Sequence, residues 1–125
     1  MRLTFDWDSV GLEDIIVQNG LAKLSHDFPA FDVYYRISAS KTGIHAMISP
    51  KDTPQPKPHE IDDEDALAYR QVMVDFGLED IWRLRGDIAR LRTGDRNTAE
   101  LWEWKNNQQA GEWIRYVEWN RAKGV

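Results

Sequence analysis

The chain has 125 residues, of which 42% are hydrophobic, and its formal net charge at pH 7 is −5. This length predicts one domain, residues 1–125, with a single core, and the lack of any apolar run of about 18 residues argues against a transmembrane helix. Because the sequence has no cysteine, disulfides and thiolate zinc sites are excluded. Asp6 and Asp8 interrupt the N-terminal apolar stretch, which argues against a signal peptide, so we expect a cytoplasmic protein without membrane contact.

Residues 2–8 are predicted to form the first strand. The segment L-T-F-D-W-D alternates polar and apolar residues, which puts Thr4, Asp6 and Asp8 on one face and the apolar side chains on the other. Two carboxylates on the same face repel each other. A hard divalent cation such as Mg²⁺, which prefers oxygen ligands, would relieve that repulsion.

A helix over residues 10–24, capped by Ser9, and two further strands are expected next. The strand-like runs cover residues 31–37 and 44–48 and are rich in β-branched, aromatic or alternating residues. Between them the turn S-A-S-K-T-G supplies hydroxyls, one cation and a flexible glycine, a combination suited to holding an anion such as phosphate. His45, at the start of the later strand, is therefore expected beside the turn.

The second half of the chain is predicted to contain a loop, a helix, two strands and a final helix. The proline-rich loop over residues 50–60 favours a surface spacer, with a lid or a partner-docking loop as the alternative. A helix over 62–77, a hairpin of strands over 89–92 and 99–105, and a helix over about 107–122 are expected to follow it. The order β-α-β-β-α-β-β-α is typical of an α+β fold in which helices back an antiparallel sheet, as in ferredoxin-like and RNA-recognition folds.

Residues 83–96 hold five arginines and two aspartates, against the acidic balance of the whole chain. Such a basic strip can engage a nucleic-acid backbone, and the candidate residues are Arg85, Arg90, Arg92 and Arg96. The alternative is a solvated face with intramolecular ion pairs. Most of the six tryptophans are expected in the core, although an exposed one could stack on a base.

The first strand and the polar turn together resemble the catalytic core of the archaeo-eukaryotic primase superfamily. That superfamily includes primase-polymerases of plasmids and phages and the polymerase domain of bacterial end-joining ligases. Its first motif is an apolar strand ending in D-x-D, matched by Asp6-Trp7-Asp8, and its second is a Ser/Gly-rich turn ending in G-x-H, matched by residues 38–45. In the ligase domains this turn usually opens S-G, and Ser40 stands where that glycine would be. The resemblance covers residues 1–50.

The resemblance implies a metal-dependent nucleotidyltransferase of DNA replication or repair, which uses a nucleoside triphosphate and a single-stranded or template-primer nucleic acid. In the family, three carboxylates hold two Mg²⁺ or Mn²⁺ ions. The implied catalytic residues are Asp6, Asp8 and His45. The implied metal ligands are Asp6, Asp8 and either Asp87 or Asp95, which flank the expected strand over 89–92. The implied contacts to the nucleotide phosphates are Ser38, Ser40, Lys41, Thr42, Gly43 and His45.

Two other functions stay open. The chain could be a non-catalytic nucleic-acid- or protein-binding module of a mobile element with a degenerate primase-like core, or an acidic interaction protein with no nucleic-acid role. The candidate residues also have simpler explanations: Asp8 suits the start of a helix, and His45 suits a hydrogen-bonded structural histidine.

Overall fold

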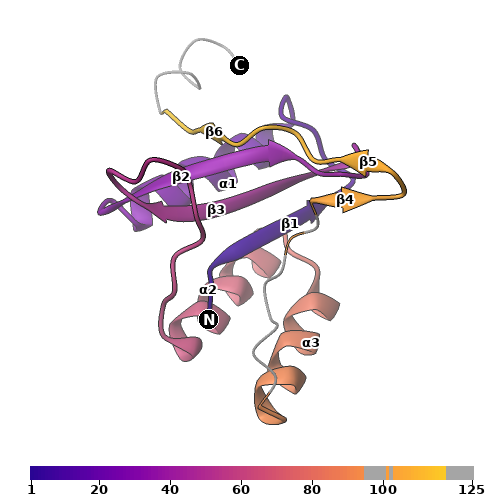
Figure 1. Ribbon diagram of the computed structural model, residues 1–125. Coiled ribbons are helices and arrows are strands. Elements are labelled where there is room, and N and C mark those ends of the chain that lie inside the picture. The colour runs from indigo at the N-terminus through magenta and orange to yellow at the C-terminus, as the bar shows by residue number, and fades with distance from the viewer. Residues whose placement is uncertain (95–100, 102, 118–125) are drawn as a thin grey trace.

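The structure is a computed structural model that describes residues 1–94, 101 and 103–117. These residues form an α+β fold with an antiparallel sheet and helices, as predicted (Figure 1). The elements in chain order are β1 (Thr4–Asp8), α1 (Ile15–Asp27), β2 (Phe31–Ile37), β3 (Gly43–Pro50), α2 (Asp63–Asp75), α3 (Ile81–Arg92), β4 (Trp104–Lys105), β5 (Gln108–Gln109) and β6 (Ile114–Arg115). Within the described part of the chain, no helix is long and apolar enough to cross a lipid bilayer.

The main sheet has the strand order β1-β3-β2-β6, and all of its neighbouring strands are antiparallel. The short strands β4 and β5 form a separate hairpin. In Figure 1, α1 lies behind the sheet, whereas α2 and α3 lie together below β1. The β4–β5 hairpin lies near the end of β1.

Strand alternation gives the sheet one apolar and one largely polar face. The side chains of Phe5 and Trp7 in β1 and Ile44 in β3 are almost fully buried in the hydrophobic core. The core also contains Leu21 of α1 and Met73 of α2, so both helices bury an apolar stripe. On the opposite side of β1, Thr4, Asp6 and Asp8 share a face, as the alternation predicts.

The predicted strand over 89–92 is wrong, because these residues form the last turn of α3. Leu84, Ile88 and Leu91 recur at i, i+4 and i+7, which is helical spacing. Asp80 caps this helix by accepting a hydrogen bond from the backbone N–H of Trp82 at 2.9 Å. Asp87 is therefore a residue of a helix and does not flank a strand.

The predicted helix over 107–122 is wrong for residues 107–117, which contain β5 and β6. Asn106 and Asn107 have φ values of 51° and 65°. Two successive left-handed residues are typical of the tight turn of a two-residue hairpin, and asparagine tolerates that conformation. The turn overrides the helical spacing of the apolar residues that follow it, while residues 118–122 lie outside the described part of the chain.

The first helix begins later than predicted, at Ile15, and its N-cap residue is Asp14 rather than Ser9. Ser9 has a φ of 59°, which belongs to a turn after β1 and not to a helix start. The helix over 62–77 is confirmed as α2: Asp62 caps it by accepting from the backbone N–H of Glu64, and Gly77 follows it with a φ of 88°.

The backbone of β1 lies close beside Gly43, the first residue of β3. A Cβ atom at Gly43 would lie 2.4 Å from the carbonyl oxygen of Trp7, so replacement by alanine is expected to push the two strands apart. We expect Gly43→Ala to lower the free energy of unfolding by about 1–3 kcal/mol.

Gly86→Ala is the matched control, because a Cβ there meets no atom within 4 Å and alanine favours the interior of α3. That substitution is expected to raise the free energy of unfolding by about 0.5–1 kcal/mol. Denaturant titration measures both values. A Gly43→Ala variant as stable as the wild type would contradict the close approach.

Candidate functional site

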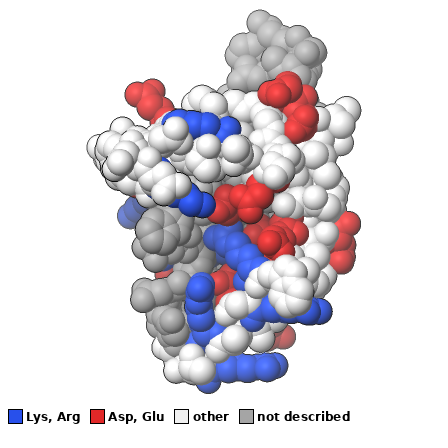
Figure 2. Space-filling model, turned by 90° about the vertical axis from the view of Figure 1, so that its right-hand side faces the viewer, with Lys and Arg blue, Asp and Glu red and all other residues white. Residues whose placement is uncertain are grey.

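A small pocket of about 40 Å³ opens at the end of β1. It is lined by residues from β1, the turn after β2, β3 and β4, namely Asp6, Asp8, Ser38, Ala39, Ser40, His45 and Lys105. Figure 2 views the molecule from the side where β1 ends and shows acidic and basic side chains in contact with each other there. The structure thus brings together the two candidate carboxylates, the candidate histidine and two hydroxyls of the predicted turn.

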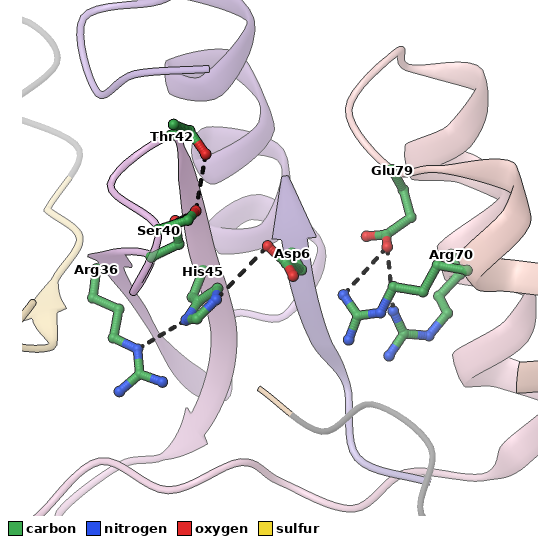
Figure 3. A network of polar contacts seen from close by, with 9 residues as sticks. Asp6, Arg36, Ser40, Thr42, His45, Arg70 and Glu79 are labelled. Atoms are coloured by element: carbon green, nitrogen blue, oxygen red, sulfur yellow. Dashed lines mark hydrogen bonds and ion pairs between the residues drawn. The ribbon is translucent and has the colours of Figure 1, made fainter. Parts of the chain in front are cut away.

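Strand register places His45 between the other polar groups. In the antiparallel pairing, His45 of β3 lies opposite Asp6 of β1 and also opposite Arg36 of β2, so the three side chains share one face (Figure 3). Arg36 Nε donates a hydrogen bond to His45 Nδ1 at 3.0 Å, and His45 Nε2 lies 3.7 Å from Asp6 Oδ1. The second distance is too long for a hydrogen bond.

The His45 ring is held neutral. Burial, and then the positive charges of Arg36 and Arg83, lower the pKa of His45 from 6.5 to about 4. The 3.7 Å approach to Asp6 is therefore not an ion pair at neutral pH. His45 can act there as an uncharged polar group.

Both carboxylates have raised pKa values, although Asp6 is half-buried and Asp8 is exposed. Burial raises the pKa of Asp6, an effect that Arg83 and Lys105 oppose. Burial also raises the pKa of Asp8, and the negative charge of Asp6 raises it further. Both shifts mean that the folded protein disfavours the charged forms, which a bound cation would reverse.

The oxygen atoms that line the pocket suit a cation that binds together with a phosphate-containing ligand. Among the described residues no group of three histidine, cysteine, aspartate or glutamate side chains is placed to hold a metal ion. Mg²⁺, however, is commonly held by one or two carboxylates together with substrate phosphates and water. Asp6 and Asp8, with the Ser38 and Ser40 hydroxyls beside them, fit that arrangement.

Asp87, one of the two candidates for a third carboxylate, does not line the pocket. Asp87 is buried against Arg70, whose Nε lies 3.2 Å from Asp87 Oδ2, and Arg90 approaches its other oxygen at 3.7 Å. These ion pairs hold Asp87 between α2 and α3, away from the residues that line the pocket. Asp95 lies outside the described residues.

The predicted phosphate-binding turn is divided between two surfaces. The Ser38 and Ser40 hydroxyls face each other at 3.1 Å, and the Ser40 and Thr42 hydroxyls at 2.8 Å. Lys41, with a φ of 64°, directs its Nζ to the backbone carbonyl of Gln109 and does not line the pocket. Gly43 does not line it either, and the close approach of β1 accounts for the glycine.

Sequence reasoning missed the contribution of the C-terminal segment. Lys105 of β4 supplies the cation of the pocket. Glu103 accepts from Arg36 Nη1, and the Trp113 ring lies under the Arg36 guanidinium at 4.2 Å. The alternation predicted a strand over 99–105 in a hairpin with 89–92. Trp104–Lys105 do form a strand, β4, but its partner is β5, so the predicted hairpin is wrong. The alternation carries no signal of a contact with β2 or β3.

A cluster of buried charges lies on the far side of Asp6 from His45 (Figure 3). Glu79 Oε1 lies 3.3 Å from Arg83 Nη1 and 3.8 Å from Arg70 Nη1. Burial raises the pKa of Glu79 to about 7, although both arginines oppose the rise. Arg83 thus connects this cluster to the pocket, since its charge also lowers the pKa of Asp6.

The predicted arginine strip lies along α3. Arg85 and Arg92 are part of this helix, and Arg90 is exposed but paired with Asp87. Arg85 stacks on the Trp82 ring at 4.9 Å, and Trp82 is 69% exposed. Arg96 lies outside the described residues.

No protein-family model matches the chain, and neither does any curated protein or solved structure. The function is therefore inferred from the geometry and chemistry of the pocket.

The lowered pKa of His45 predicts a pH dependence of stability. Between about pH 6.5 and pH 4 the unfolded chain binds a proton at this position that the folded chain does not, so the free energy of unfolding falls as the pH falls. In His45→Gln this fall should be smaller than in the wild type. Denaturant titrations at several pH values across this window measure the difference, and identical slopes for both proteins would contradict the burial of a neutral His45.

Proposed function

We propose that this chain is a primase-like nucleotidyltransferase domain, which binds a nucleoside triphosphate with Mg²⁺ or Mn²⁺ at the pocket of Asp6, Asp8 and His45. Such a domain would act in replication or repair of DNA, in a plasmid or phage setting. The observation that carries the proposal is that residues of both motifs line one pocket although the motifs lie far apart in the sequence: Asp6 and Asp8 of D-x-D, and Ser38, Ser40 and His45 of S-x-S-x-x-G-x-H.

The arrangement of strands is compatible with this proposal. The order β1-β3-β2, with α1 between β1 and β2, is a split β-α-β unit, which ferredoxin-like and RNA-recognition folds also contain. The fourth strand, β6, pairs with β2. We propose a primase-like core built on this unit rather than a complete ferredoxin-like sheet.

Each pocket residue has a role in the proposed reaction. Asp6 and Asp8 would hold the cation, which when bound would lower the cost of the charge that develops on the phosphates. His45, the Ser40 hydroxyl and Lys105 bind phosphate oxygens and orient the triphosphate. In this proposal Lys105 has the phosphate-binding role that the family resemblance implied for Lys41. Lys41 instead contacts the backbone carbonyl of Gln109 and does not line the pocket.

A second function, a non-catalytic nucleotide- or nucleic-acid-binding module, is favoured by one observation. Two-metal phosphoryl transfer in the resembled family uses a third carboxylate, and none lies in the pocket among the described residues. Asp87 could act as the third metal ligand only by leaving Arg70. Arg70 would then be buried without its ion-pair partner Asp87, which costs several kcal/mol.

The nucleotide site is tested by thermal denaturation with a nucleoside triphosphate and Mg²⁺ or Mn²⁺. Wild-type protein should gain several degrees in melting temperature, because a ligand that binds only the folded state stabilises it. Asp6→Asn should not show that gain, since one cation ligand is no longer charged. His45→Ala should weaken binding by about 1–3 kcal/mol.

Asp52→Asn is the matched control, because it removes the same charge from an exposed turn outside the pocket. An equal response of the wild type and Asp6→Asn would refute the site. If triphosphate binds but primer is neither made nor extended, the non-catalytic module is the correct function.

The nucleic-acid surface is tested by fluorescence titration with single-stranded oligonucleotides. Replacing Arg85 or Arg92 by alanine should weaken binding and make the slope of log K against log salt shallower by about one unit, because one phosphate fewer is neutralised. Lys51→Ala, which removes an exposed charge elsewhere, should have little effect. Absence of binding even at low salt would leave α3 as a solvated helix with internal ion pairs.

A further inference from the structure

Arg36 is the one described residue that links His45 to the C-terminal segment by side-chain hydrogen bonds. Only 5% of its surface is exposed, and its guanidinium is held on three sides. Nε donates to His45 Nδ1, Nη1 donates to Glu103, and the ring of Trp113 covers one face. Arg36 does not line the pocket. Its hydrogen bonds are therefore directed at the groups around the pocket and not at a ligand inside it.

The contact with Arg36 decides which nitrogen of His45 carries the proton. A guanidinium group has only donors and stays protonated, so His45 Nδ1, at 3.0 Å from Arg36 Nε, must accept. A neutral imidazole has one donor and one acceptor, and the proton therefore lies on Nε2. His45 Nε2 is the nitrogen that approaches Asp6 at 3.7 Å, on the side of the pocket.

We propose that Arg36 is a positioning residue that holds His45 in the tautomer with its proton on Nε2, so that His45 donates to a phosphate oxygen in the pocket. The proposal rests on the proposed function, because it specifies how the same site recognises phosphate. It also assigns a role to Glu103 and Trp113, which orient Arg36 from the C-terminal segment. His45 is then an anion-binding donor and not a metal ligand, since metal binding through Nε2 would require that nitrogen to be unprotonated.

Glu103 is itself held in place. Gln109 Nε2 donates to Glu103 Oε1 at 3.1 Å, across the β4–β5 hairpin, while Arg36 donates to the other oxygen. The hydrogen bonds from Gln109 and Arg36 lower the pKa of Glu103, so the group stays ionised as the counter-charge of Arg36. The same hairpin carries Lys105, whose side chain lines the pocket.

The tautomer is measured directly on the wild-type protein without any ligand. Long-range proton–nitrogen correlation NMR of isotope-labelled protein distinguishes a protonated ring nitrogen from an unprotonated one. We expect His45 to show a protonated Nε2 and an unprotonated Nδ1. A protonated Nδ1 would overturn the proposal.

The effect on the ligand is measured by a double-mutant cycle on triphosphate affinity, with Mg²⁺ present. Arg36→Met and His45→Ala should each weaken binding by about tenfold, the scale of one charged hydrogen bond. Because Arg36 acts through His45, the double variant should bind about tenfold rather than about a hundredfold more weakly. Arg115→Met, the matched control, removes an exposed arginine outside the pocket and should leave the triphosphate affinity unchanged.

Arg36→Met removes a buried group, so Glu103→Ala provides a second route that leaves the core intact. Glu103 is 49% exposed at its side chain, and its removal should loosen Arg36 and weaken triphosphate binding less than Arg36→Met does. That effect should vanish in the His45→Ala background. Additive effects in either cycle would mean that Arg36 or Glu103 acts independently of His45 and would overturn the proposal. Failure of the wild type to bind triphosphate would instead overturn the proposed function, while the NMR measurement still decides the tautomer.

Discussion

The antiparallel pairing of β1 with β3 is the constraint on which the site depends. It places Asp6 opposite His45, with Phe5 and Trp7 turned toward the core on the other face. A shift of one residue would move every side chain of β1 to the opposite face and bury both carboxylates in the core. Gly43 contributes to this register, because only a residue without Cβ fits beside the Trp7 carbonyl.

The pocket is held together at a cost to stability. The pKa values of Asp6 and Asp8 are raised, so the fold disfavours their charged forms, and His45 is kept neutral by burial beside Arg36. On the other side of β1, Arg70 and Glu79 are buried as ion pairs, which are weak contributors to stability because desolvation offsets their attraction. Local costs of this kind are common where a site is preorganised for a charged ligand, and they are compatible with the proposed function.

Residues 103–113 of the C-terminal segment contribute to the site, although they belong to neither of the two sequence motifs. The β4–β5 hairpin brings Lys105 to the pocket and Glu103 to Arg36, and Trp113, just before β6, covers Arg36. These contacts join residues far apart in the chain. They make this side of the pocket, where we propose that phosphate binds, depend on a segment whose own strands are only two residues long.

The sequence by itself determined the first three strands, α1, α2 and the shared face of Asp6 and Asp8, because alternation and helical spacing are local properties. The third helix and the last strands were not predictable in the same way. Residues 89–92 fit either a short strand or the end of a helix, and residues 107–117 have helical spacing that the left-handed Asn106 and Asn107 override. Only the tertiary structure decided that Lys105 and not Lys41 lines the pocket, that Asp87 is held by Arg70, and that Arg36 contacts His45. These are contacts between strands and helices, and their partners are set by the packing of the whole chain rather than by the residues beside them.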